Sequence, residues 1–176
     1  MKIKFLILFL LFNLSLVYAQ REAGIWYFGN EAGLDFNSGS PVALTNGKLI
    51  TNEGCSTISD FNGNLLFYSD GTTVWSSNHS VMQNGQGLLG NASSTQSAII
   101  VPHPGNPDHY FLFTVGTEVG GGVSGFNYYL VDVSMNNGLG KVIQGPVDLA
   151  QGRSWEWSEK VAAINGDDCT TFWVVS

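Results

Sequence analysis

The sequence predicts an all-β protein, and in particular an incomplete β-propeller of about three to four blades. The chain of 176 residues has 22 glycines, 12% aromatic residues and 12% charged residues, which favours strands and tight turns over helices. An Asn-Gly-Asn turn separates two strand-like runs in residues 57–70, and this is a strong hairpin signal. The same pattern of run, glycine turn and aromatic-rich run recurs at 99–115 and 161–176.

The first element is an N-terminal signal. Two lysines precede a nearly unbroken apolar run at 5–17, and small or modest residues lead to Ala19. This arrangement predicts a secretory signal peptide over 1–19 and a mature domain over 20–176. The alternative is a membrane anchor, but a run of thirteen residues is shorter than the roughly 18–20 needed to span a bilayer. We therefore expect a secreted or cell-surface protein, exported through the periplasm, with no membrane span in the mature chain.

Alternating and aromatic-rich runs predict the strands that follow. Residues 78–97 are polar and glycine-rich, so we expect a surface connection there. Residues 136–140 are expected to turn the chain, and no run beyond the signal shows the apolar stripe of a helix. The expected strands, other than those of the third hairpin at 161–176, are 24–28, 33–36, 41–44, 57–60, 65–68, 72–76, 98–102, 109–115, 126–133 and 141–149.

The spacing of the repeated hairpin favours a propeller over a β-sandwich, which is the alternative fold. The turn glycines Gly63, Gly105 and Gly166 are 42 and then 61 residues apart. A period of about 40–45 residues with four strands a unit is typical of propeller blades, and a single blade needs neighbours to cover its faces. A closed propeller needs at least about four blades. We therefore expect the domain to be truncated at its C-terminus, with further domains downstream.

Charge and cysteine content restrict the partners. The mature chain keeps 14 acidic and five basic residues, a formal net charge of −9, which disfavours nucleic acid and anionic lipid. Cys55 and Cys169 are far apart in the sequence, and export permits a disulfide between them. We expect two buried, unpaired thiols, and the disulfide is the alternative. No cofactor is predicted, because the chain has neither a Cys-x-x-Cys pair nor a phosphate-binding glycine loop.

Oxygen-bearing side chains alternate in the first hairpin turn. Asp60, Asn62 and Asn64 resemble the start of a calcium-binding loop and are candidate metal ligands. Such a loop places glycine at position 6 and glutamate at position 12, whereas here glycine is fourth and Gly71 is twelfth. A hairpin turn therefore explains the same residues better.

Aromatic and acidic residues alternate near the third hairpin. Trp155 and Trp157 are candidates for stacking on a sugar ring, with packing in the core as the alternative. Glu156 and Glu159 are candidate catalytic residues, because glycosidases use paired carboxylates about 5–10 Å apart. The three histidines, at 79, 103 and 109, have no carboxylate–histidine spacing that indicates a metal site.

Several segments together resemble a known family, and they are residues 26–30, 32–36, 40–47, 53–60, 63–75 and 87–107. Through them the chain is similar to the N-terminal region of large exported proteins of Bacteroidota, of the gliding-motility-associated type that carries a C-terminal sorting domain for type IX secretion. The resemblance implies a propeller-like architecture, export, and display or release at the cell surface, and it implies no enzyme activity.

Three function classes follow from these observations. The first is a non-catalytic surface module that binds a glycan or another exported protein and acts in adhesion or assembly. The second is an extracellular polysaccharide-active enzyme, a glycosidase or lyase on a propeller scaffold. The third is a purely structural stalk segment of a larger adhesin. We expect the first, because no motif in the sequence specifies a reaction.

Overall fold

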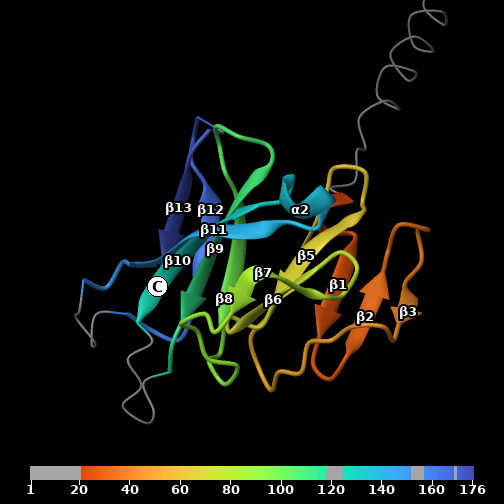
Figure 1. The fold of residues 1–176 in the computed structure, drawn as a ribbon, viewed down its shortest axis with the longest axis horizontal. Coiled ribbons are helices and arrows are strands. Elements are labelled where there is room, and N and C mark those ends of the chain that lie inside the picture. Colours follow the sequence, from red (N-terminus) through yellow and green to blue (C-terminus); the bar gives the residue numbers. More distant parts are fainter. Residues whose placement is uncertain (1–20, 118–124, 152–156, 169) are drawn as a thin grey trace, which may run out of the picture.

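The computed structural model describes residues 21–117, 125–151, 157–168 and 170–176, which form an all-β fold (Figure 1). The helical elements among these residues are a 3₁₀ turn, η1 (Arg21–Ala23), and the four-residue element α2 (Met135–Gly138). In α2, Asn136 and Asn137 have φ of 53° and 57°, so this element is a left-handed turn of the chain. The all-β prediction is confirmed, and so is the turn expected at 136–140.

The strands are arranged in three sheets. The N-terminal sheet has the order β1-β2-β3, an eight-stranded sheet has the order β4-β5-β6-β7-β11-β10-β9-β8, and β12-β13 form a C-terminal hairpin. The bounds are β1 (Ile25–Phe28), β2 (Ala32–Asp35), β3 (Val42–Leu44), β4 (Ser56–Ser59), β5 (Leu65–Ser69), β6 (Thr73–Ser76), β7 (Val81–Gln86), β8 (Ala98–Pro102), β9 (His109–Val115), β10 (Phe126–Asp132), β11 (Lys141–Asp148), β12 (Ala162–Asn165) and β13 (Phe172–Val175).

The eight-stranded sheet consists of two antiparallel halves. Strands β4–β7 form the first half and β8–β11 the second half, each in chain order. A single parallel pair, Gln83 with Lys141, joins β7 to β11. The predicted hairpins at 57–70, 99–115 and 161–176 are confirmed, because β4–β5, β8–β9 and β12–β13 are antiparallel pairs. Each hairpin supplies the first two strands of its half or sheet.

Neighbouring side chains of β5 point to opposite faces of the sheet and so belong to two different hydrophobic clusters. Tyr68 points to the N-terminal sheet, where its ring stacks on Tyr27 with centroids 4.7 Å apart. Its neighbour Phe67 points to the second half, where it meets the ring of Tyr110. Adjacent residues of a strand face opposite sides of the sheet, so an unbroken aromatic pair fills two cores at once.

Three hydrophobic clusters therefore lie between four successive layers. The first layer is the N-terminal sheet, followed by the first half, the second half and the C-terminal hairpin. The cluster between the two halves is the largest, and it includes Phe67, Val74, Met82, Leu112, Tyr129 and Val131. The last cluster contains Val115, Trp157 and Val161, with Val174 of β13 packed against it. Burial between layers, rather than within one sheet, stabilises this fold.

The first strands of successive layers lie together, with β1 against β4, β4 against β8, and β8 against β12. Two hydrogen bonds to the backbone of Gly54 hold the entry to β4 beside the entry to β8. Gly54 donates its N–H to the carbonyl of Ser94 at 3.2 Å, and the Ser97 hydroxyl donates to the carbonyl of Gly54 at 2.5 Å. This end of the layers is therefore closely packed, whereas β7 and β11 meet at the opposite edge.

The segment 78–97 has many exposed side chains, as expected of a surface connection, but it also contains a strand and buried residues that were not expected. Strand β7 lies within this segment and pairs with β6, and the side chain of Met82 is 2% exposed. Ser94 and Ser97 are fully buried because their hydroxyls donate to the backbone carbonyls of Val115 and Gly54. Hydrogen bonds of this kind allow a polar segment to lie inside the molecule. Within the described part of the chain, no helix is long and apolar enough to cross a bilayer.

Candidate functional site

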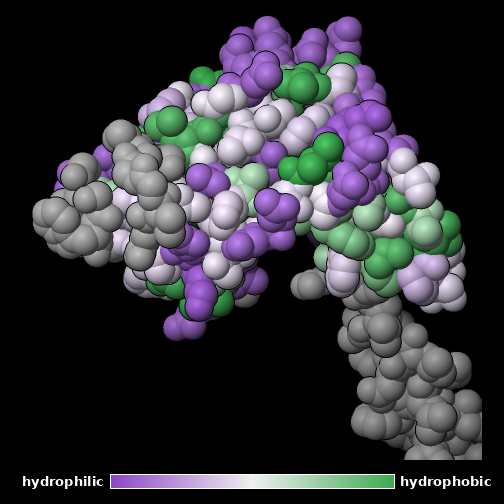
Figure 2. Space-filling view, turned by 90° about the horizontal axis from the view of Figure 1, so that it is seen from below, coloured by the Kyte–Doolittle hydropathy of each residue, from purple (hydrophilic) through white to green (hydrophobic). Residues whose placement is uncertain are grey.

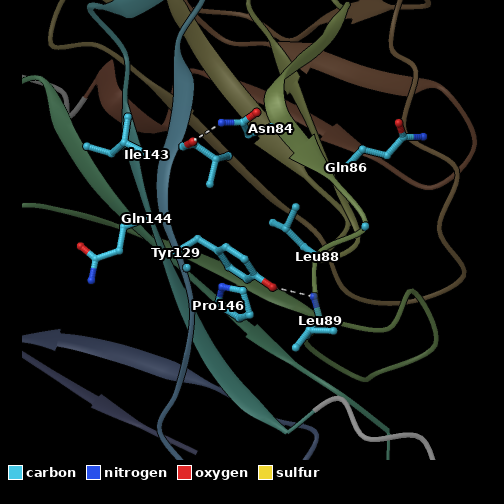
Figure 3. Close-up of a pocket in the computed structure, with 11 residues that line it drawn as sticks. Asn84, Gln86, Leu88, Leu89, Tyr129, Ile143, Gln144 and Pro146 are labelled. Carbon is cyan, nitrogen blue, oxygen red and sulfur yellow. Dashed lines mark hydrogen bonds between the residues drawn. The ribbon is translucent and has the colours of Figure 1, made fainter.

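A pocket of about 460 Å³ lies where the two halves of the eight-stranded sheet diverge beyond the Gln83–Lys141 pair. Strand β7 and the turn after it form one wall, β11 forms the other, and a side chain of β10 lies at its floor (Figure 3). The lining residues are Asn84, Gln86, Gly87, Leu88, Leu89, Tyr129, Val142, Ile143, Gln144, Gly145 and Pro146.

Tyr129 is the floor of the pocket. It is 4% exposed, and its hydroxyl accepts the N–H of Leu89 at 2.8 Å (Figure 3). The carbonyl of Leu89 accepts the hydroxyl of Thr114 at 3.1 Å, so both backbone groups of this residue are held by the second half. Burial raises the pKa of Tyr129, although the bond from Leu89 opposes this effect. The phenol therefore stays protonated and retains a hydrogen to donate.

Amide side chains surround this floor. Asn84 spans the gap between the strands, because its Nδ2 donates to the carbonyl of Val142 at 3.1 Å. Its backbone has a φ of 61°, so β7 leaves extended geometry here, and its Oδ1 remains an acceptor. Gln86 and Gln144 are exposed and lie on opposite sides of the pocket (Figure 3). Donors and acceptors thus face an apolar surface from both walls.

Irregularities in β11 shape the second wall. The register between β10 and β11 shifts on both sides of Leu130, so β11 bulges at Ile143 and again at Gly145 and Pro146. Gly145 has a φ of 118°, and a Cβ there would lie 2.5 Å from Cδ1 of Tyr129. Glycine at this position allows the backbone of β11 to lie against the tyrosine ring.

All the lining side chains are uncharged at neutral pH. Amides, a phenol and carbonyl groups can bind hydroxyl or amide groups of a ligand, and Leu88, Ile143 and Pro146 offer apolar contact. The lining carries no acid–base pair or nucleophile–base pair. This chemistry suits reversible binding of a neutral, polar ligand.

The candidate metal ligands form a hairpin turn. One carboxylate oxygen of Asp60 accepts the backbone N–H groups of Asn62 and Asn64, and the other accepts Nδ2 of Asn64. Partial desolvation raises the pKa of Asp60, but these hydrogen bonds outweigh it and lower the pKa below its usual value. Gly63, with a φ of 90°, completes the turn. The turn interpretation thus accounts for the side chains of Asp60 and Asn64 and for the backbone N–H of Asn62.

Other ligand sets for a metal are not evident in the part of the chain that the structure describes. No three histidine, cysteine, aspartate or glutamate residues gather there as metal ligands would. His109 pairs with Asp132, with Nε2 and Oδ2 3.4 Å apart, and its ring meets that of His103 edge to face.

The candidate residues near the third hairpin differ in how deeply they are buried. Trp157 is 9% exposed and belongs to the cluster with Val115 and Val161, so the structure favours packing for this residue. Glu159 is half-buried, and its backbone carbonyl accepts the N–H of Gln96 at 2.9 Å. Trp155 and Glu156 lie outside the described residues. The proposed Glu156/Glu159 pair and the Trp155 stacking site stay predictions.

Cys55 has a free thiol, whose Sγ donates to the carbonyl of Tyr27 at 3.4 Å. Burial raises the pKa of this thiol, and the nearby charge of Asp70 raises it further. Cys169 lies outside the described residues. In the structure, Cys55 is therefore an unpaired thiol. A disulfide with Cys169 stays a prediction.

Sequence reasoning marked 78–97 as long enough to be a functional loop but did not join it to the second wall of the pocket, because the two segments are about 60 residues apart. Local signals were present: Asn84, Gly85, Gln86 and Gly87 interrupt the alternation of a strand, and Gly145-Pro146 interrupts another. Such residues mark bulges and turns, but they do not indicate that two interrupted strands are neighbours.

Comparisons with known proteins add no family to this geometry. No protein-family model matches the chain, no curated protein matches it, and no solved structure matches it.

Proposed function

We propose that this protein is an exported, non-catalytic surface module that binds neutral glycan chains in the pocket between β7 and β11. In this proposal its layers are neighbouring blades of an incomplete propeller. The module belongs to a larger surface protein of the type IX-secreted, gliding-motility-associated kind from Bacteroidota. The meeting of the first strands β1, β4, β8 and β12 supports the propeller arrangement, because a propeller places its first strands around one axis.

The uncharged lining of the pocket carries the functional proposal. A neutral sugar presents hydroxyl groups that both donate and accept hydrogen bonds, and it also presents apolar C–H faces. Amides match this pattern because each has an acceptor oxygen and two donor hydrogens. Gln86 and Gln144 supply amides from opposite walls, and the Tyr129 hydroxyl supplies a donor from the floor. Exposure of both glutamines keeps them accessible to a large glycan.

A segment of another exported protein is the second candidate ligand. Strands β7 and β11 are joined by one residue pair and then separate, so parts of their facing edges have no strand partner among the residues that the structure describes. An extended peptide could add to such an edge through its backbone, as in β-augmentation. The Asn84–Val142 hydrogen bond already occupies one carbonyl of this edge, which is why the glycan is preferred.

Binding can be tested with a panel of neutral oligosaccharides and calorimetry on the glycans that are retained. The double variant Gln86→Ala/Gln144→Ala should bind about tenfold more weakly, because it removes two amide contacts. Gln83→Ala is the matched control, since Gln83 is an exposed glutamine of β7 outside the pocket lining. Retention of peptides but of no glycan would replace the proposal with the second candidate. Equal weakening by the control would place binding elsewhere.

A further inference from the structure

The pocket is closed at the end where β7 and β11 meet. Gln83 pairs with Lys141 at this point. The next residue of β7, Asn84, donates its Nδ2 to the carbonyl of Val142, the next residue of β11, at 3.1 Å. Figure 3 shows this bond crossing from one wall of the pocket to the other. Successive residues of the two strands are thus tied together, and a ligand cannot extend along the gap in this direction.

The turn after β7 closes the opposite end of the pocket (Figure 3). The N–H of Leu88 donates to the carbonyl of Thr72 at 2.9 Å, and the N–H of Leu89 donates to the hydroxyl of Tyr129 at 2.8 Å. The carbonyl of Leu89 accepts the Thr114 hydroxyl at 3.1 Å. Hydrogen bonds to both halves of the eight-stranded sheet therefore hold the backbone of this turn, so this end is closed as well.

The remaining boundaries of the pocket are a floor and a mouth. The ring of Tyr129 is the floor, and the backbone of Gly145 lies against it, since a Cβ at Gly145 would be 2.5 Å from Cδ1 of the ring. The exposed side chains of Gln86 and Gln144 lie on opposite sides of the mouth (Figure 3). Hydrophobic residues gather at the end of the molecule formed by the N-terminal sheet (Figure 2), whereas this mouth carries two amides. The pocket is therefore a pit with one polar opening.

We propose that this pit binds the end of a neutral glycan chain and not an internal stretch, a step that rests on the proposed glycan binding. A terminal sugar residue is linked to one neighbour, so it can reach the floor while the rest of the chain leaves through the mouth. An internal residue is linked on two sides, and its neighbours have to extend along the gap that Asn84 and Leu89 close. A chain laid across the mouth would contact Gln86 and Gln144 but not Tyr129.

The size and chemistry of the pit fit a terminal residue. Its volume of about 460 Å³ lies in the lower part of the range of roughly 300–1,000 Å³ for ligand pockets, which suits about one or two sugar residues. A chain end carries a hydroxyl group where an internal residue carries a glycosidic oxygen. This additional donor matches the acceptor Oδ1 of Asn84, whose Nδ2 is already bonded to Val142. Asn84 thus closes the pit and selects for a chain end.

The test compares intact and end-blocked forms of linear neutral oligosaccharides from the maltose, cellobiose, laminaribiose and xylobiose series by calorimetry. Borohydride reduction opens the ring at the reducing end, and O-methylation blocks the terminal hydroxyl at the other end. Blocking one end of a bound glycan should weaken binding by about tenfold or more, because polar groups in the pit lose their partner. Blocking the other end should change binding by less than about twofold, and short and long members of a series should bind equally per molecule.

Asn84→Gly tests the closed end directly. Glycine fits the φ of 61° at this position and removes both the side chain that crosses the gap and the acceptor Oδ1. The preference for an unblocked end should therefore fall from about tenfold to about threefold or less. Asn137→Gly is the matched control and should keep the preference, because Asn137 has a φ of 57° in an exposed turn outside the pocket lining. Asn84→Asp tolerates the same φ and lacks the amide donor, so it replaces the glycine variant where that variant does not fold.

The outcomes separate this inference from the proposed function. Equal binding of both end-blocked forms, or affinity that rises with the number of internal residues, overturns the inference while glycan binding itself stands. An unchanged preference in the Asn84 variant contradicts the closure of the pit by Asn84. Retention of no neutral glycan overturns the proposed function, and this inference with it.

Discussion

The hydroxyl of Tyr68 lies 3.1 Å from Nδ1 of His79, which joins β5 to the turn before β7. The hydroxyl accepts the N–H of Lys48 at 3.1 Å, and it also accepts Nδ1–H of His79, because Nε2 of the neutral ring is the acceptor that faces the Asn46 amide nitrogen. The other ring nitrogen of His79 lies 2.8 Å from the Asn46 amide, which in turn binds the Tyr27 hydroxyl. A neutral histidine thus links the N-terminal sheet to the first half.

This contact predicts a dependence of stability on pH. Burial lowers the pKa of His79, and the charge of Lys48 lowers it further. A lowered pKa in the folded state means that stability is complete above the unfolded pKa of about 6.5 and is lost as the pH falls through the folded pKa. Asparagine tolerates the φ of 65° found at this position. His79→Asn should therefore lose less stability than the parent protein between neutral and mildly acidic pH, measured by urea unfolding.

His103→Asn is the control for this experiment, because the His103 ring contacts those of His109 and Phe111 and takes no part in the Tyr68–His79 contact. It should keep the pH dependence of the parent protein. An identical pH dependence in His79→Asn and the parent protein would show that His79 does not cause it.

The core between the two halves depends on Phe67, which is fully buried between them. Phe67→Ala should lower the free energy of unfolding by about 3–5 kcal/mol, because it removes an aromatic side chain and leaves a cavity. Phe61→Ala is the matched control: Phe61 is 76% exposed, and its loss should change stability by less than about 0.5 kcal/mol. Denaturant unfolding measures both. Similar losses in the two variants would contradict the position of Phe67 in the core.

The floor of the pocket depends on the Tyr129 hydroxyl. Tyr129→Phe keeps the ring but leaves the N–H of Leu89 without its acceptor, which should cost about 1–3 kcal/mol. Tyr128→Phe, at the next position of β10, changes a half-buried tyrosine on the other face and should cost less than about 0.5 kcal/mol. Hydrogen exchange at the Leu89 amide should become faster in the first variant alone. Unchanged exchange would show that the bond is not formed in solution.

The close approach of β4 and β8 depends on Gly54. A Cβ at this position would overlap the backbone nitrogen of Ser97 and the backbone of Gln96. Gly54→Ala should therefore cost about 1–3 kcal/mol or more through overpacking. At Gly105 a Cβ would lie 3.5 Å from the His103 ring, an ordinary contact, so Gly105→Ala should be nearly neutral. Thermal unfolding compares the two, and a stable Gly54→Ala variant would contradict this packing.

The hairpins could be predicted because their signals are local. The Asn-Gly-Asn turn requires a positive φ at Gly63, and the structure has 90° there. Gly105 and Gly166 were predicted to be turn glycines by the same pattern, but neither has a positive φ. The strand-like runs beside them, and not the glycines, therefore identified these two hairpins. The repetition of the hairpin also indicated a layered all-β body, whereas the propeller itself stays a prediction.

The pocket and the buried serines could not be predicted because they depend on non-local contacts. The pocket exists because Gln83 pairs with Lys141, 58 residues further along the chain. The burial of Ser94 and Ser97 depends on carbonyls of Val115 and Gly54 that reach them from other strands. A polar composition indicates an exposed segment only when such partners are absent.

The propeller proposal depends on one arrangement, in which successive layers pack face to face in chain order. Nuclear Overhauser contacts in the chain from residue 21 test it most directly. The ring protons of Tyr27 should contact those of Tyr68, and the ring protons of Phe67 should contact those of Tyr110, since these centroids are 4.7 Å and 5.8 Å apart. The layered arrangement would be contradicted if neither expected pair gave a contact and the rings of Phe67 and Tyr68 both contacted one and the same partner ring.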